Sequence, residues 1–195
     1  MKTVSANHSA SREDELPPVR MLRHPGPMPA TRWTSVENPG APALRLALPA
    51  GSTLYEALVP VLRERGVTAC AINLLDGHFT RGAYCLARPM PDIAQVIAYT
   101  SPIMVGRDLR LIGAGATLGE DERGAPLLHC HGLLVDAEGR LIGGHLLTEQ
   151  CVIGPGGCVA YVHVLGSTRL TRRYDPHIQL AVFQPEPKGD PHADH

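Results

Sequence analysis

The stretch that most restricts the fold of this chain is residues 127–145, LLHCHGLLVDAEGRLIGGH. Two alternating apolar segments flank the turn-forming residues DAEG, which is typical of a β-hairpin with Gly139 in the turn. A hairpin makes the second segment run back along the first, so that residues far apart in sequence become cross-strand neighbours. The stretch therefore predicts a sheet-based domain whose hairpin carries three histidines.

The spacing of these histidines indicates a metal site. His129 and His131 are two residues apart, so on a strand they share a face, roughly 7 Å apart. A simple register places His145 opposite Cys130, whereas a one-residue bulge at Gly143-Gly144 places it opposite His131. With this bulge three imidazoles converge, as in a catalytic-type zinc site with an open fourth position. The alternative is that the histidines bind no metal and are hydrogen-bonded structural residues.

The remaining sequence divides into three parts. Residues 1–41 are rich in Pro, Ser, Arg and His, which disfavours regular elements, and we interpret them as an extension. The single tryptophan, Trp33, is a candidate anchor within it. Residues 42–185 carry the periodic patterns of a folded domain, and residues 186–195 form a polar tail.

One helix and many strands are predicted for the folded part. Residues 49–66 predict a helix whose first turn has a capping box formed by Thr53 and Glu56. Pro60 should kink or shorten this helix. The sequence that follows is mostly strand-like, with a turn expected at Asp76-Gly77. The expected fold class is α+β, an antiparallel sheet with one principal helix packed on it.

Composition narrows the classes of partner. The chain has 195 residues, 18 basic and 19 acidic, and only 4% aromatic residues. This balance disfavours a protein that grips a phosphate backbone or stacks bases. Five cysteines without a CxxC pair are typical of a reduced protein. No apolar run has transmembrane length and no secretory signal is visible, so we expect a cytoplasmic protein without a membrane partner.

The segment LHCHGLLVDAEGRLIGGHLL resembles the central motif of the PPC (plants and prokaryotes conserved) domain family. In that family an HxH strand, a D/E-x-G hairpin and a GGH segment follow one another in this order. The segment LPAGSTLYEALVPVLRERGVTACAINLLDG resembles the family's opening, and RRYDPHIQLAVFQP resembles its closing segment. The resemblance covers roughly residues 42–185.

The resemblance implies an antiparallel sheet with a packed helix, commonly assembled as a homotrimer. Archaeal and bacterial members that keep three histidines bind zinc with them, which implies Zn2+ bound by His129, His131 and His145. Plant members lack the triad and attach AT-hooks that bind AT-rich DNA, and many bacterial relatives carry a DNA-binding label. This chain has no Arg-Gly-Arg-Pro core of an AT-hook, so nucleic acid is not the favoured partner.

Substrate-binding or proton-transfer groups would have to lie near the metal for catalysis. The candidates are Arg173, which could bind a carboxylate, together with Asp175, His78 and His163, each of which has a structural alternative. The leading hypothesis is a zinc-binding PPC-type protein that binds a small metabolite, with hydrolase or lyase chemistry left open. The alternatives are a DNA-binding, transcription-associated protein and an assembly module with structural zinc.

Overall fold

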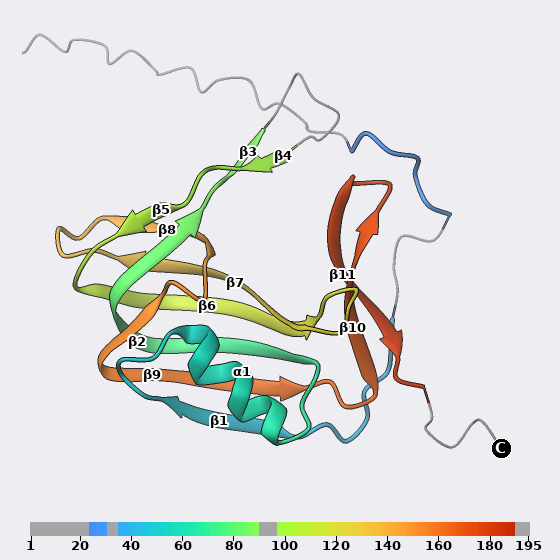
Figure 1. Ribbon diagram of the computed structural model, residues 1–195, viewed down its shortest axis with the longest axis horizontal. Coiled ribbons are helices and arrows are strands. Elements are labelled where there is room, and N and C mark those ends of the chain that lie inside the picture. Colours follow the sequence, from blue (N-terminus) through green and yellow to red (C-terminus); the bar gives the residue numbers. More distant parts are fainter. Residues whose placement is uncertain (1–23, 31–34, 90–96, 190–195) are drawn as a thin grey trace, which may run out of the picture.

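The computed structural model of this chain describes residues 24–30, 35–89 and 97–189 (Figure 1). The predicted anchor Trp33, most of the predicted extension and the end of the predicted tail lie outside the described residues. Within the described part, one helix and a series of strands follow each other along the chain. They are β1 (Ala43–Leu48), α1 (Leu54–Glu64), β2 (Cys70–Cys85), β3 (Ala87–Pro89), β4 (Ile97–Tyr99), β5 (Ile103–Val105), β6 (Leu109–Glu120), β7 (Pro126–Val135), β8 (Leu141–Leu146), β9 (Val152–Val164), β10 (Thr168–Asp175) and β11 (Leu180–Pro187).

Nine of these strands form one mixed sheet in which β2 is the most connected strand. The order is β1-β9-β2-β8-β7-β6-β10-β11, and β5 pairs with β2 beside this path. Strand β2 also pairs with β6, so that β2, β6, β7 and β8 form a closed circuit of neighbours. The strands pair antiparallel except β6 and β10, which run parallel where Thr171 lies beside Glu120. Strands β3 and β4 form a separate two-stranded sheet.

The predicted α+β arrangement with one principal helix on an antiparallel sheet is wrong. The helix has only 11 residues, whereas β2 and β9 have 16 and 13, and the large sheet is mixed. The expected turn at Asp76-Gly77 is instead a bulged part of β2, where Asp76 has a φ of 55° and the register with β9 shifts. Residues that permit positive φ serve bulges as well as turns, which is why the pattern misled.

The helix is shorter than the predicted range 49–66 and runs from Leu54 to Glu64, with Thr53 as its N-cap. Glu56 N donates to Thr53 Oγ1 over 3.2 Å, and Thr53 N donates to Glu56 Oε2 over 2.9 Å, which confirms the capping box. Pro60 does not end the helix, which continues to Glu64. Its side chain is exposed, so the ring lies away from the sheet.

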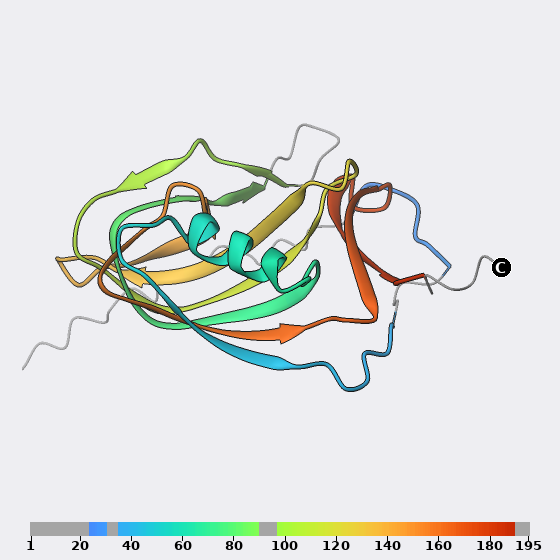
Figure 2. The same cartoon turned by 60° about the horizontal axis from the view of Figure 1, so that its bottom comes forward.

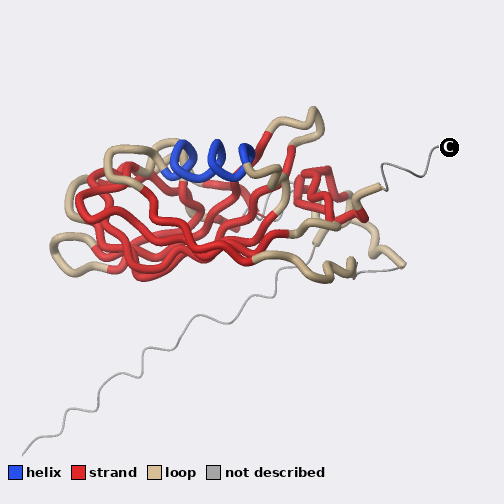
Figure 3. The backbone as a smooth tube through the Cα atoms, turned by 90° about the horizontal axis from the view of Figure 1, so that it is seen from below, coloured by secondary structure: helices blue, strands red, loops and turns tan. Residues whose placement is uncertain are grey.

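The helix covers one face of the sheet and leaves the other open (Figures 2 and 3). Leu54, Leu58 and Leu62 are fully buried on this covered face, at the spacing of one helical stripe. The opposite face carries exposed apolar side chains, among them Leu75 and Leu133. This second face also carries His131, because His131 is two residues from Leu133 on β7 and alternate side chains of a strand point to the same face.

The state of the cysteines agrees with the sequence prediction. All five cysteines are free and buried, as the absence of a pairing pattern predicted. In the part of the chain that the structure describes, no helix has the length and apolar character needed to cross a membrane.

Strand β8 fits between β7 and β2 because two of its residues have no side chain. Gly143 and Gly144 have φ values of 151° and 148°, which L side chains rarely adopt. A Cβ on Gly143 would lie 2.1 Å from the carbonyl oxygen of Gly132, and one on Gly144 would lie 2.5 Å from that of Cys85. The strand can therefore occupy this place only with glycine at both positions.

We expect Gly143→Ala to lower the free energy of unfolding by about 2–3 kcal/mol, because the added methyl group meets backbone atoms that cannot move aside. Urea unfolding followed by circular dichroism measures the change. Gly115→Ala on β6 is the matched control, since a Cβ there meets nothing within 4 Å, and it should change stability by no more than about 0.5 kcal/mol. Equal losses in the two variants would contradict this account of β8.

Candidate metal centre

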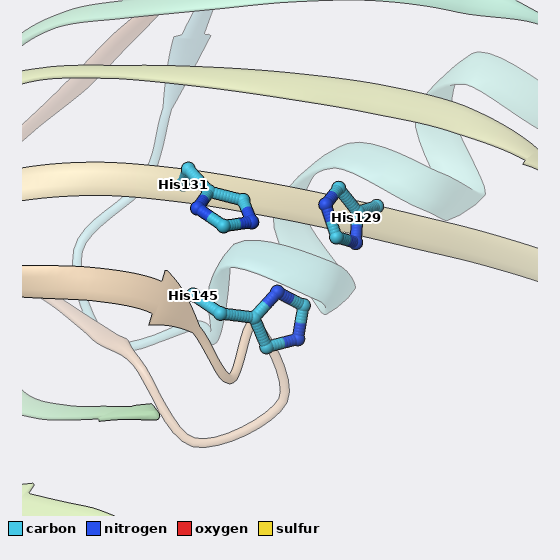
Figure 4. A group of neighbouring side chains, drawn as sticks. All are labelled: His129, His131 and His145. Atoms are coloured by element: carbon cyan, nitrogen blue, oxygen red, sulfur yellow. The ribbon is translucent and has the colours of Figure 1, made fainter. Parts of the chain in front are cut away.

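Three histidine side chains meet at the open face of the β7–β8 pair (Figure 4). His129 and His131 come from β7, and His145 comes from the end of β8. Their ring centroids are 4.7–5.3 Å apart, and one potential ligand nitrogen of each lies within 4.8 Å of the others. His129 and His145 are partly buried and His131 is exposed. The arrangement leaves one side of the cluster accessible.

The register that brings the histidines together differs from the predicted one. Val135 pairs with Leu141, and pairing continues without a shift to His131 opposite His145. No bulge is needed at the two glycines of β8, because the additional residue lies in the turn. Gly139 has a φ of 80°, as expected for the left-handed position of a three-residue hairpin loop.

The carboxylate of Asp136 holds this turn in shape. Its Oδ1 accepts hydrogen bonds from the backbone N–H groups of Glu138 and Arg140, at 3.1 and 2.8 Å. Its Oδ2 accepts a further bond from Arg140 Nε at 2.7 Å, and together these bonds lower the pKa of Asp136. The turn length therefore depends on an Asp at position 136, and the turn length sets the position of His145.

The cluster favours neutral imidazoles. Burial lowers the pKa of His129 to about 4, with contributions from the nearby charges of His145, His131 and Arg172. Burial and the proximity of His131 also lower the pKa of His145. A neutral imidazole has a free nitrogen lone pair at neutral pH, which is the form that binds a metal.

One nitrogen of the cluster needs a partner. His145 Nδ1 is buried and has no hydrogen-bond partner among the described residues. A buried polar nitrogen without a partner costs about 1–3 kcal/mol. A metal ion bound by the three imidazoles would suit this donor set, since three histidine nitrogens are a common zinc ligand set. The residues present therefore fit a metal ion.

A family profile described as the Plants and Prokaryotes Conserved (PCC) domain matches residues 37–163. The chain belongs to this family. The family predicted from the sequence is thereby confirmed. The matched residues extend from just before β1 into β9 and include the three histidines, but they do not include the closing segment at residues 172–185.

Solved structures share the fold of this family member. A metal-containing protein from Archaeoglobus fulgidus is 19% identical over 79% of this chain and 99% of its own, with a TM-score of 0.62. A plant- and prokaryote-conserved protein from Pyrococcus horikoshii is 18% identical over 73% and 91%, with a TM-score of 0.59. A protein from Ralstonia eutropha, provisionally named DNA-binding, is 24% identical over 72% and 89%, also with a TM-score of 0.59. No curated protein matches the chain.

Of the other predicted site residues of this PCC domain protein, Arg173 and Asp175 are engaged near the β10–β11 hairpin. The guanidinium of Arg173 forms an ion pair with Glu186 on β11. The carboxylate of Asp175 accepts hydrogen bonds from the backbone N–H groups of His177 and Ile178, which follow it in the turn. Neither side chain lines the cleft beside the histidines.

The other two predicted histidines lie elsewhere on the sheet. His78 is on β2 with its Nε2 3.4 Å from Asp108 Oδ1, and the hollows that it lines contain none of the three clustered histidines. His163 is exposed on β9 in the row of Ala43 and Ala71. The structure does not bring either side chain into the cluster.

A cleft of about 410 Å3 adjoins the cluster, and His129 and His145 form part of its wall. Arg172 on β10 and Tyr99 on β4 complete its polar lining, and the Tyr99 ring lies 5.1 Å from that of His145. Sequence reasoning did not identify either residue as part of the site. Arg172 and its neighbour Arg173 point to opposite faces of the strand, but the sequence does not show which of the two side chains faces the histidines.

The low pKa of His129 makes the stability of the metal-free protein depend on pH. The unfolded chain binds a proton at this residue near pH 6.5, whereas the folded chain does so only near pH 4. We therefore expect Tm to fall by several degrees as the pH is lowered from 6.5 to 4, and to be insensitive to this group above 6.5. Calorimetry across this range, in a chelating buffer, measures the change.

His129→Gln is the control for this prediction, since it removes the titrating group and leaves the rest of the cluster in place. Its Tm should fall less than that of the native chain between pH 6.5 and 4. If Tm falls equally with pH in the two proteins, folding does not lower the pKa of His129, and the prediction is wrong.

Proposed function

We propose that this PCC domain protein binds one zinc ion through His129, His131 and His145, and that a small molecule binds in the adjoining cleft. The observation that supports this most directly is the approach of three imidazole nitrogens to within 4.8 Å of one another, beside a cleft whose wall includes His129 and His145. The low pKa values of His129 and His145 add to it, because ligand nitrogens must be unprotonated.

Zinc is the metal that the donor set favours. Three neutral nitrogens without a carboxylate suit a borderline ion, whereas calcium and magnesium prefer oxygen ligands. Zinc bound by three protein ligands retains a position for water or a ligand oxygen, and it polarises a carbonyl or acidifies that water. A structural zinc usually has four protein ligands, and the cluster among the described residues has three.

Ligand binding is better supported than a reaction. Hydrolase or lyase chemistry needs a group that transfers a proton at the reacting atom. Besides the two histidines, the ionisable groups of the described cleft wall are Tyr99 and Arg172. A general base of ordinary carboxylate type is therefore not among them, and we propose catalysis only as an extension of ligand binding.

Association with DNA is the second candidate, and it rests on the provisional name of the Ralstonia eutropha protein. The composition of this chain speaks against it, because 18 basic and 19 acidic residues leave no positive surplus. Non-specific DNA affinity arises mainly from cationic side chains that displace counterions. A protein of this charge would need a concentrated basic stripe to bind DNA.

We further propose that the chain assembles as a homotrimer through the open face of its sheet. Leu75, Gly113 and Leu133 form one row across β2, β6 and β7, and Ile112 lies beside it. The three large side chains are 42–56% exposed, an apolar patch that is typical of a subunit contact. Leu133 is two residues from His131, so this contact would lie beside the metal cluster.

Metal content per chain tests the central proposal. Untagged protein purified without chelator should contain about one zinc per chain by elemental analysis, and His131→Ala should contain almost none, because two imidazoles hold zinc too weakly to survive purification. His163→Ala on β9 is the matched control, since it removes an exposed histidine outside the cluster. It should retain the native zinc content.

Two outcomes of this assay would redirect the interpretation. A native protein that takes up no zinc, even when zinc is added, would contradict the proposal and favour the DNA-associated alternative. Unfolding of the whole domain when zinc is chelated would show a structural metal instead, as in the assembly-module alternative.

Leu133→Asp should convert the trimer to a monomer, because a carboxylate would be buried without a partner at the β7 end of the apolar row, inside the proposed contact. Light scattering coupled to size-exclusion chromatography measures the change. Met104→Asp on β5 is the matched control, since Met104 is also exposed but lies outside the row, and it should remain trimeric. A native protein that elutes as a monomer would contradict the proposed assembly.

A further inference from the structure

We infer that the cleft beside the histidines selects ligands with a carboxylate, and that Arg172 binds it. The ligand would have an apolar middle and, at its other end, a carbonyl or similar oxygen that approaches the histidine cluster. This inference rests on the proposed zinc site and names the class of molecule that the site accepts. It assigns Arg172 a role as a ligand-binding residue.

The three arginines of β10 differ in their partners, and this difference identifies Arg172. Arg169 lies 3.4 Å from Glu120, and Arg173 is paired with Glu186. The side chain of Arg172 has no hydrogen bond or ion pair with any described residue, although it is on the same strand. Its guanidinium therefore keeps all its donors available for a bidentate contact with a carboxylate.

The cleft itself favours an anion with an apolar body. Its described wall contains Arg172, two histidines and Tyr99 but no carboxylate. The remaining wall is largely apolar and is formed by Leu127 and Leu128 of β7 and by residues 180–183 of β11. Its volume of about 410 Å3 is within the usual range for small-molecule sites. A cationic ligand would find no counter-charge there.

Acidic groups are present on the other side of Arg172 and could compete with a ligand carboxylate for its guanidinium. A neighbouring hollow of about 250 Å3 is lined by Asp121, Glu122, Arg123 and Arg172. Asp121 uses its Oδ1 to accept backbone hydrogen bonds from Arg123 and Ala125, which fixes its own turn. Glu122 and the second carboxylate oxygen of Asp121 are the remaining rivals for the guanidinium, and neither forms an ion pair with Arg172.

The test uses paired probes on the zinc-loaded full chain. Hydroxamates bind zinc through their oxygens, so a hydroxamate joined by two to four methylene groups to a carboxylate is compared with its methyl ester. Calorimetry should show that at least one carboxylate binds about tenfold more tightly than its ester, because a charge-assisted bond to Arg172 is added. Arg172→Gln should abolish this preference without changing the zinc content.

Control variants separate this role from a general effect of charge. Arg169→Gln removes an equal charge from the same strand, and it should keep the tenfold preference. Arg172→Lys should keep only part of it, since a lysine cannot form the bidentate contact. Glu122→Gln should leave the preference within about twofold of native, because no bond between Glu122 and Arg172 is broken.

The failure of this inference can be distinguished from failure of the zinc site. Carboxylates and esters that bind the zinc-loaded protein equally for every linker length would overturn the role of Arg172 while the zinc site stands. A preference that survives in Arg172→Gln, or that increases strongly in Glu122→Gln, would also overturn it. If elemental analysis finds no zinc before any probe is added, the metal site and this inference both fail.

Discussion

The candidate site depends on a close backbone contact between β7 and β8. The carbonyl oxygen of Gly132 occupies the space where a side chain on Gly143 would lie, and Gly144 fits as closely against Cys85 of β2. Because β8 contacts the backbone of β7 on one side and of β2 on the other, it has little freedom to shift along either strand. His145 is the residue that follows the two glycines, so this packing holds it opposite His131, in the register that the turn length sets.

The same packing creates the electrostatic character of the cluster. Burial penalises the charged forms of His129 and His145, and the neighbouring imidazoles of the cluster lower the pKa of both groups further. The fold therefore favours the neutral forms of His129 and His145, and it leaves His145 Nδ1 buried without a hydrogen-bond partner among the described residues. A cation relieves both costs at once, since it accepts the lone pairs and needs no proton.

Local sequence patterns identified the features that depend on neighbours along the chain. The capping box of Thr53 and Glu56 was predicted from a spacing of three residues, and the shared face of His129 and His131 from a spacing of two. The family was predicted from an ordered motif, and the family profile confirms it. Each of these rests on contacts that are fixed within one element or one hairpin.

Local patterns could not predict features that change when the strand register shifts by one residue. They also could not predict contacts between strands that are far apart in the sequence. A turn one residue longer than expected changes which residue faces His145, and Asp136 decides that length through its own hydrogen bonds. Tyr99 and Arg172 reach the cleft from the small β3–β4 sheet and from β10 of the large sheet. The sequence pattern around His129 contains no sign of either residue. The candidate metal ligands of this domain can therefore be predicted from its hairpin. The groups that would select a ligand come from strands that only the three-dimensional structure places beside the hairpin.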